Sequence, residues 1–476
     1  MLQSNGQEAS SQSIVSPYSL PATHYSPKAM MRIAHSVDEG RVMLLSRRSL
    51  DQLAATPALA RRILDTFGEA LTPLQVAERI VSAVRDEGDA ALARYCRLID
   101  GAYHQPLRIG PEQMRAALGQ VSVELRADFE LAAERILDFH RKSLRRSWFE
   151  TSPWGVFGQV IRPLGRVGLY VPGGTAVYPS SLLMTALPAK AAGVEEIVVT
   201  TPAAKDGTVP AAVLLAADVA GVSAVYRVGG AQAIAAMAYG TESVPRVDKI
   251  LGPGNIFVAL AKRLVAGVVG IDAVTGPTET LVLADETAQV EHVAADLLAQ
   301  SEHDPLAQAV LVTTSARLVE ELPAEIERQL SSLHRAAIAR ESLEGRGVAV
   351  VVDSLGEAVD LANEYAPEHL CLAVSDPWSL LNSVRAAGGI FLGHQSVEAL
   401  GDYVAGPSHV MPTGGTARFA SPLTTDDFVK VSSLFGVTDA GLREMGPAAA
   451  RMAMVEGLDA HAASILRRLD GLVEAL

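Results

Sequence analysis

The sequence contains very few cysteines. Only Cys96 and Cys371 occur among 476 residues, and they lie far apart in the chain. Neither belongs to a C-x-x-C pair, so the sequence predicts neither a disulfide framework nor a thiolate zinc site. A reducing cytoplasm is therefore the expected location of this protein.

Runs of basic residues and long apolar runs are also lacking. The chain has 40 Lys and Arg against 54 Asp and Glu, which gives a formal net charge of −14 and argues against a surface for nucleic acid. The apolar stretch from Val209 to Val225 is interrupted by Pro210, Asp218 and Gly221. A membrane-spanning helix needs about 20 predominantly apolar residues. We therefore expect neither nucleic acid nor a membrane as a partner.

The first 29 residues are rich in serine and contain no continuous apolar segment. They match neither a secretory signal nor an Arg-rich transit peptide, so we expect a disordered extension. Over the whole chain, 49% hydrophobic and 20% charged residues are typical of a soluble globular enzyme.

Two stretches of alternating strands and helices are predicted. Apolar residues recur at helical spacing from Thr72 to about Arg145, after which strand, glycine turn and helix alternate from Arg166 onward. The same alternation returns from Ala307, which predicts two α/β units with parallel sheets. The expected division is a first α/β domain of residues 30–169 plus 279–420, which includes the helical lead-in, a second of residues 170–278, and a helical tail of residues 421–476.

The predicted tail is amphipathic and cannot bury its apolar side alone. It either folds back on its own chain or packs on a second copy, and its sequence does not distinguish the two.

Three glycine-rich turns are candidate phosphate sites. They are VPGGTAVYPSS from Val171, VGGAQA from Val228 and LGPGNIFVALAKRL from Leu251. None is a G-x-G-x-x-G sequence. The third is the best candidate, because GPGN would open a helix whose free N–H groups and positive dipole end face a pyrophosphate. The alternative is a tight strand-to-helix turn that uses glycine for its conformation alone.

The segment AQSEHD places Gln300 and His303 three residues apart at the end of a predicted helix, and so on one face. This spacing suits a shared metal ion, although a surface pair or an internal polar contact would have the same spacing. Asp402 and His461 would complete two imidazoles and two oxygens, a ligand set suited to Zn²⁺.

Glu368 and His369 are adjacent in NEYAPEHL, in an otherwise apolar neighbourhood. Adjacent residues of a strand point to opposite faces, so a site containing both requires a turn, which Pro367 favours. Imidazole is the usual acceptor of an alcohol proton, and a carboxylate can activate water. A strand entrance with an exposed acid and a hydrogen-bonded histidine is the alternative.

Six segments in this order resemble the histidinol dehydrogenase family: GPGN, TGPTE, AQSEHD, NEYAPEHL, GDYVAGPSHVMPTGGTARF and EGLDAHA. They are spread over most of residues 155 to 470. The resemblance implies two Rossmann-like domains and a zinc-dependent enzyme that oxidises L-histidinol to L-histidine through L-histidinal, with two NAD⁺. It also implies a homodimer in which the C-terminal tail reaches the partner's active site.

The resemblance assigns a role to each matching position. The residues that match the family's zinc ligands are Gln300, His303, Asp402 and His461. Glu368 matches the residue that activates water for attack on the aldehyde, and His369 matches the general base for the alcohol. One zinc ion is expected in each subunit.

Further positions match the family's substrate and cofactor sites. Besides the zinc ligands and His369, the positions that match the substrate pocket are Thr278, His409 and Glu456. Those that match the NAD⁺ site are Tyr170, Gln232 and Asn255. Thr278 and Ser408 depart from the family's frequent Ser and Asn, which narrows the pocket slightly and leaves one loop hydrogen bond in doubt.

Two other functions compete with histidinol oxidation. A relative that oxidises another small alcohol, such as a sulfonated diol, is disfavoured by Glu456, because an acid would repel a sulfonate. A catalytically idle zinc- or NAD-binding scaffold is disfavoured because both catalytic groups and all four ligand types are present.

Overall fold

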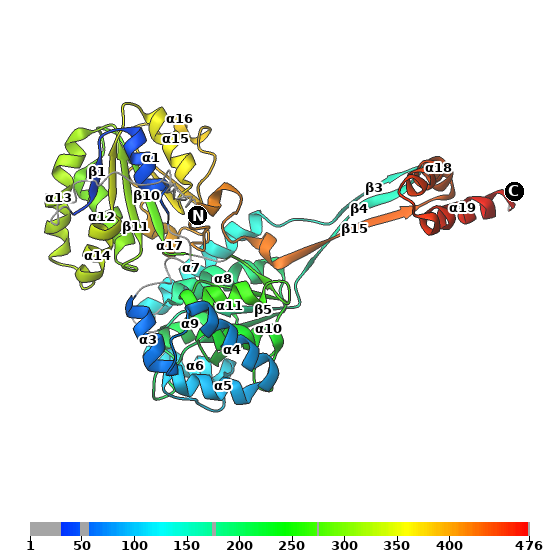
Figure 1. Cartoon of the computed structure of the whole chain (residues 1–476), viewed down its shortest axis with the longest axis horizontal. Helices are drawn as coiled ribbons and strands as arrows, with labels where there is room; N and C mark the ends of the chain where they lie inside the picture. Colours follow the sequence, from blue (N-terminus) through cyan, green and yellow to red (C-terminus); the bar gives the residue numbers. More distant parts are fainter. Residues whose placement is uncertain (1–29, 48–56, 174–177, 274–275, 475–476) are drawn as a thin grey trace, which may run out of the picture.

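The computed structural model describes residues 30–47, 57–173, 178–273 and 276–474. The expected extension at residues 1–29 lies outside the described residues. Two α/β units lie side by side, and a long ribbon with two helices at its end projects away from them (Figure 1).

The first unit is built on a sheet of six parallel strands. In spatial order they are β1 (Arg32–Ala34), β12 (Val348–Val351), β11 (Gln308–Thr313), β10 (Glu279–Ala284), β13 (His369–Ala373) and β14 (Gly389–Leu392). Strands β10 and β11 are buried along their whole length. Their sequences contain continuous apolar runs, as is typical of strands covered on both faces.

Helices cover both faces of this sheet. Val282 and Ala284 contribute to the core beneath α12 (Val290–Ser301), α13 (Ala316–Leu330) and α14 (Ala336–Arg346). Leu281 and Leu283 contribute to the opposite core, beneath α1 (Val37–Leu45) and α15 (Leu355–Tyr365). The side chains of successive β10 residues thus point to opposite faces of the sheet and pack in different cores, as the two-residue repeat of a strand requires. The short helices α16 (Pro377–Leu381) and α17 (Glu398–Tyr403) follow β13 and β14.

The second unit has a six-stranded sheet in which only the edge strand is antiparallel. In spatial order its strands are β2 (Arg108–Ile109), β7 (Ala224–Arg227), β6 (Glu196–Thr201), β5 (Arg166–Tyr170), β8 (Lys249–Leu251) and β9 (Gly270–Ile271). The chain moves outward from β5 through β6 to β7 and then returns to place β8 on the other side of β5. The first sheet does the same around β10, so the predicted repetition of architecture is confirmed.

The helices of the second unit include the predicted lead-in. One core lies beneath α6 (Pro111–Ala117), α7 (Val123–Lys142), α8 (Pro179–Ala192) and α9 (Ala211–Ala220). The other lies beneath α3 (Pro57–Phe67), α4 (Pro73–Glu87), α5 (Asp89–Tyr95), α10 (Gly230–Tyr239) and α11 (Ile256–Val265). A π-helix (Cys96–Asp100) and a 3₁₀ turn (Leu118–Gln120) complete this region.

The lead-in had been expected to accompany the first α/β unit. It packs on the second instead, because apolar residues of α4 such as Val76 and Ile80 share a core with α10 and α11. The predicted start of this region is confirmed, since Thr72 caps α4 in a capping box with Gln75.

The C-terminal region begins with a strand, whereas residues 421–476 had been expected to be helical. Strand β15 (Val429–Val437) pairs with β4 (Gly155–Pro163), which pairs in turn with β3 (Trp148–Ser152), all antiparallel. Short 3₁₀ turns (Thr416–Arg418 and Thr425–Phe428) precede β15, and α18 (Asp439–Val455) and α19 (Asp459–Glu474) follow it. We call β3, β4, β15, α18 and α19 the arm.

The arm exposes much apolar surface to solvent. Phe435 is 73% exposed and Val455 is 90% exposed, and Trp148, Phe149 and Met452 are exposed as well. Within the described part of the chain, α18 and α19 pack mainly on each other. Among the same residues, no helix is both long and apolar enough to cross a membrane.

Candidate active site

Glu368 and His369 lie at the junction between α15 and β13. Helix α15 ends at Tyr365, and Ala366 then adopts a left-handed conformation with φ 48°, which reverses the chain before Pro367. The carbonyls of Pro367 and Glu368 accept hydrogen bonds from the N–H groups of Gly388 and Gly389, at 2.9 and 2.8 Å. His369 Nδ1 lies 3.8 Å from Glu368 Oε2, so both side chains reach one site, as predicted.

The Glu368 carboxylate is buried and held by two donors. Thr278 Oγ1 donates to it at 2.7 Å and the Glu279 N–H at 3.0 Å. Burial raises the pKa of Glu368 to about 7, although the neighbouring His369 and both hydrogen bonds act to lower it. This carboxyl group can therefore exchange a proton near neutral pH.

The His369 imidazole is buried and uses only one of its two nitrogens. Nδ1 lies 3.1 Å from the Glu279 carbonyl oxygen and 3.0 Å from Gln300 Nε2. Among the described residues, Nε2 has no hydrogen-bond partner although it is buried. A carbonyl only accepts, so a proton on Nδ1 donated to Glu279 leaves the Nε2 lone pair free to accept a proton.

Three of the four predicted zinc ligands belong to the same region of the first unit. Gln300 lies in the last turn of α12, His303 follows that helix, and Asp402 lies on α17. Desolvation lowers the pKa of His303, and the charge of Asp402 opposes this shift, which places the two groups within electrostatic reach. Gln300 is in direct contact with His369.

His409, a predicted substrate residue, contacts Asp402. Its Nδ1 is 3.0 Å from the Asp402 backbone carbonyl and 3.9 Å from the Asp402 carboxylate. Its Nε2 is 3.1 Å from Ser181 Oγ on α8 of the second unit. Burial lowers the pKa of His409, while Asp402 raises it. This histidine joins the two α/β units at the site.

Glu456 and His461 lie elsewhere within one chain. Glu456 ends α18 and His461 is in the first turn of α19, so both belong to the turn at the far end of the arm (Figure 1). Both are exposed. The structure therefore does not bring them to Glu368 and His369 of the same chain.

Within the described residues of one chain, only three of the four predicted zinc ligands lie in the same region. In the described ranges, no three His, Cys, Asp or Glu residues lie close enough together to hold a metal ion. Gln300, His303 and Asp402 provide one amide oxygen, one imidazole and one carboxylate, all suited to Zn²⁺ as a partial set. A fourth ligand from outside the chain would complete it, and an exposed His461 on a projecting arm fits that requirement.

The predicted NAD⁺ positions follow the carboxyl ends of strands in the second unit. Tyr170 ends β5, and its hydroxyl accepts a hydrogen bond from the Gly230 N–H at 3.1 Å. Gln232 on α10 donates to Asp100 at 3.2 Å and is fully buried. Asn255 follows β8. Ligands of open α/β sheets bind where the strand order reverses, which here is between β5 and β8.

The GPGN turn opens a helix, as predicted. Asn255 caps α11 and accepts from the N–H groups of Phe257 and Val258, so two of the free donors are already used. The buried Lys262 pairs with Asp272 and donates to the Gly252 carbonyl at 3.1 Å. GPGN thus forms a tight turn between β8 and α11, and a charged pair beneath it fixes its shape.

Sequence reasoning missed Glu398, Glu279 and Ser181. Glu398 is buried and contacts Gln300, and Glu279 supplies backbone groups to both Glu368 and His369. The spacing of Glu398 and Asp402, four residues apart on one helix, was the available signal. The contacts of Glu279 and Ser181 depend on neighbouring elements and gave no sequence signal.

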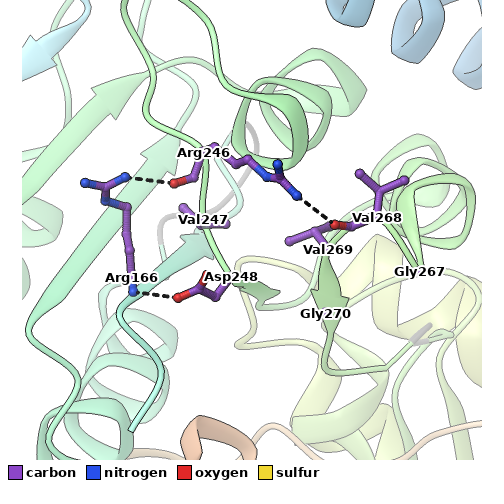
Figure 2. Close-up of a pocket in the computed structure, with 8 residues that line it drawn as sticks. All are labelled: Arg166, Arg246, Val247, Asp248, Gly267, Val268, Val269 and Gly270. Carbon is purple, nitrogen blue, oxygen red and sulfur yellow. Dashed lines mark hydrogen bonds between the residues drawn. The ribbon is translucent and has the colours of Figure 1, made fainter.

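A cavity of about 630 Å³ lies away from these residues. Figure 2 shows its lining, which includes Arg166, Arg246 and Asp248 near the amino ends of β5 and β8. Arg166 pairs with Glu196 and donates to the Arg246 carbonyl, and Arg246 donates to the Val268 carbonyl. The cavity contains none of the predicted site residues.

Two α/β units and a buried carboxyl–imidazole pair are typical of an α/β enzyme, and within the described part of the chain one imidazole nitrogen has no partner. Comparison with known proteins specifies its family. The histidinol dehydrogenase family profile matches residues 69–469. Histidinol dehydrogenase of Deinococcus radiodurans is 54% identical over 424 residues, 89% of this chain and 97% of the relative. That of a Synechococcus strain is 48% identical over 430 residues, 89% of this chain and 99% of the relative.

A solved structure gives the same result. The crystal structure of histidinol dehydrogenase from Elizabethkingia anophelis matches with a TM-score of 0.85 and 34% identity, covering 93% of this chain and 99% of that one. The chain belongs to the histidinol dehydrogenase family, whose members are NAD-dependent oxidoreductases.

Replacing Ala366 tests how the chain reversal supports the site. Ala366→Val should destabilise the protein by at least about 2 kcal/mol, because a β-branched residue is strained at positive φ and would crowd Ala386 and Ala417. Ala366→Gly is the control and should stay within about 1 kcal/mol. Urea unfolding measures both, and equal midpoints for Val and Ala would contradict this reading of the turn.

Proposed function

We propose that this protein oxidises L-histidinol to L-histidine through L-histidinal with two NAD⁺, the last steps of histidine biosynthesis. The observation that carries the proposal is the buried Glu368–His369 pair, in which His369 Nε2 has no partner among the described residues. Family membership supports the substrate. A cytoplasmic location agrees with two cysteines that are buried free thiols.

His369 is the proposed general base of the first oxidation. With its Nδ1 proton donated to the Glu279 carbonyl, Nε2 accepts the hydroxyl proton of the alcohol. NAD⁺, when bound, supplies the hydride acceptor. Burial of His369 excludes water and holds the imidazole in one orientation.

Glu368 is the proposed base of the second oxidation. As a carboxylate it removes a proton from a water molecule that attacks the aldehyde carbon, and the hydrate formed loses a second hydride. Thr278 and the Glu279 N–H hold its Oε2 atom, which leaves Oε1 to meet the water. A pKa near 7 matches the strength required of a base at neutral pH.

Gln300, His303, Asp402 and His461 are the proposed zinc ligands, one ion per subunit. Bound zinc would act as a Lewis acid that holds the amine and imidazole nitrogens of the substrate and orients its reacting carbon. Glu456 would pair with a cationic or N–H group of histidinol, and His409 and Thr278 would line the same pocket. Tyr170, Gln232 and Asn255 are the proposed NAD⁺ contacts.

The proposed assembly is a homodimer that exchanges its arms. Glu456 and His461 lie together at the tip of the arm, and the exposed apolar residues along the arm require a covering surface. A second copy of the chain would supply that surface, and its first unit would receive both residues. No observation of the fold favours a different alcohol or a scaffold role.

Steady-state turnover tests the proposed reaction. Purified protein with L-histidinol and NAD⁺ should release two NADH per histidine, lose activity when a chelator removes the metal, and recover when zinc is restored. The expected ratio follows from two hydride transfers. A folded, zinc-loaded protein that releases no NADH from histidinol would contradict the proposal, and small amino and sulfonated alcohols would then be screened.

The pH dependence of aldehyde oxidation tests Glu368. Because burial raises its pKa to about 7, the carboxylate form increases as pH rises through 7, and the rate with supplied histidinal should rise with it. Glu368→Gln should slow this step more than the first hydride transfer and abolish the rise. Equal losses in both half-reactions, or an unchanged pH profile, would remove Glu368 from the role of base.

Mixed dimers test the base and the arm exchange together. His369→Asn should slow turnover by a factor on the order of 10² to 10⁴, and His461→Ala should disable zinc binding. If arms are exchanged, a heterodimer has one site with both defects and one intact site. Refolding an equal mixture should therefore restore about a quarter of wild-type activity. No restoration in a demonstrated heterodimer would show that each arm serves its own chain.

A further inference from the structure

Glu398 is a buried carboxylate to which no role has yet been assigned. It opens α17, is 4% exposed, and accepts a hydrogen bond from Thr280 Oγ1 at 2.9 Å. Its other oxygen accepts from Gln300 Nε2 in a short hydrogen bond. Cys371 Sγ lies 3.7 Å from it. A buried carboxyl group is costly unless it is hydrogen-bonded, so these contacts stabilise Glu398 in the interior.

The contact with Gln300 decides which atom of the amide is available. An amide binds a metal ion through its carbonyl oxygen, since its nitrogen carries hydrogens and no free lone pair. Gln300 Nε2 donates to Glu398 Oε1, so this contact holds the amide with its nitrogen toward Glu398. Among the described residues, Gln300 Oε1 then has no hydrogen-bond partner.

We propose that Glu398 is a positioning residue, which orients the Gln300 amide so that its oxygen is the atom available to the metal. This inference rests on the proposed zinc site. Helix α17 would then supply one ligand directly, Asp402, and orient a second, Gln300 of α12, through Glu398. Outer hydrogen-bond partners of metal ligands typically change metal affinity or activity by about 10- to 100-fold.

The dissociation constant for zinc, measured by competition with a chromophoric chelator, tests the proposal independently of turnover. Glu398→Leu removes the acceptor and should weaken zinc binding about 10- to 100-fold. Glu398→Gln keeps an acceptor oxygen and should stay within about threefold of wild type. A folded Glu398→Leu variant with wild-type zinc affinity would overturn the inference.

Asp296→Asn is the matched control. Asp296 is a partly buried acid whose charge acts on Glu398, but within the described chain its side chain makes no hydrogen bond to Gln300. Losing its charge should leave zinc affinity within about threefold of wild type. A loss as large as that of Glu398→Leu would attribute the effect to charge and contradict the positioning role.

An exchanged pair keeps the proposal testable if Glu398→Leu fails to fold. In Gln300→Glu two carboxylates face each other, and adding Glu398→Gln restores one donor and one acceptor. The second substitution should tighten zinc binding by roughly tenfold in that background, but not in the wild-type background. No gain in the double variant would overturn the inference.

The outcomes separate this inference from the proposed function. Wild-type protein that binds no zinc, or Gln300→Ala that binds it normally, would contradict the zinc site itself. Loss of zinc in Gln300→Ala but not in Glu398→Leu would contradict only the role of Glu398.

Discussion

The parallel pairing of β10 with β13 is the constraint on which the active site depends. Thr280 lies opposite His369 in this register, so the residues just before each strand meet at the amino edge of the sheet. Thr278 and Glu279 then provide the hydroxyl, N–H and carbonyl that hold Glu368 and His369. A slip of one residue would turn every side chain of β13 to the other face and separate the pair from these partners.

The predicted cofactor residues and the Glu368–His369 pair lie at opposite edges of their respective sheets. In the second unit, the predicted cofactor residues follow the carboxyl ends of the strands, at the reversal of strand order where α/β folds usually bind ligands. In the first unit, the proposed catalytic pair, Glu368 and His369, lies at the amino ends of the strands. His409, which touches both Asp402 and Ser181 of α8, links the two. The predicted site residues of the first unit thus lie close to the place where the two units meet.

Much of this arrangement could be predicted from the sequence, for local reasons. Strand and helix periodicity indicated both α/β units, and the proline after Ala366 indicated a turn at Glu368 and His369. What could not be predicted depends on distant contacts. The sequence of α4 shows that it is an amphipathic helix but not which sheet it covers. Strand β15 pairs with β4, which lies far from it in the sequence. Glu279 contacts Glu368 and His369 through its backbone N–H and carbonyl, which its residue type does not reveal. Glu398 was overlooked although its spacing from Asp402 was visible.

In the proposed dimer, one chain holds three ligands of a metal site that a second copy completes. A crystal structure of the zinc-loaded protein, with an anomalous-scattering map at the zinc edge, would show this assembly. We expect one zinc per chain, bound by Gln300 Oε1, His303 and Asp402 of one copy and by His461 of the other. Zinc at other residues, or His461 binding the metal of its own chain, would overturn the proposed assembly.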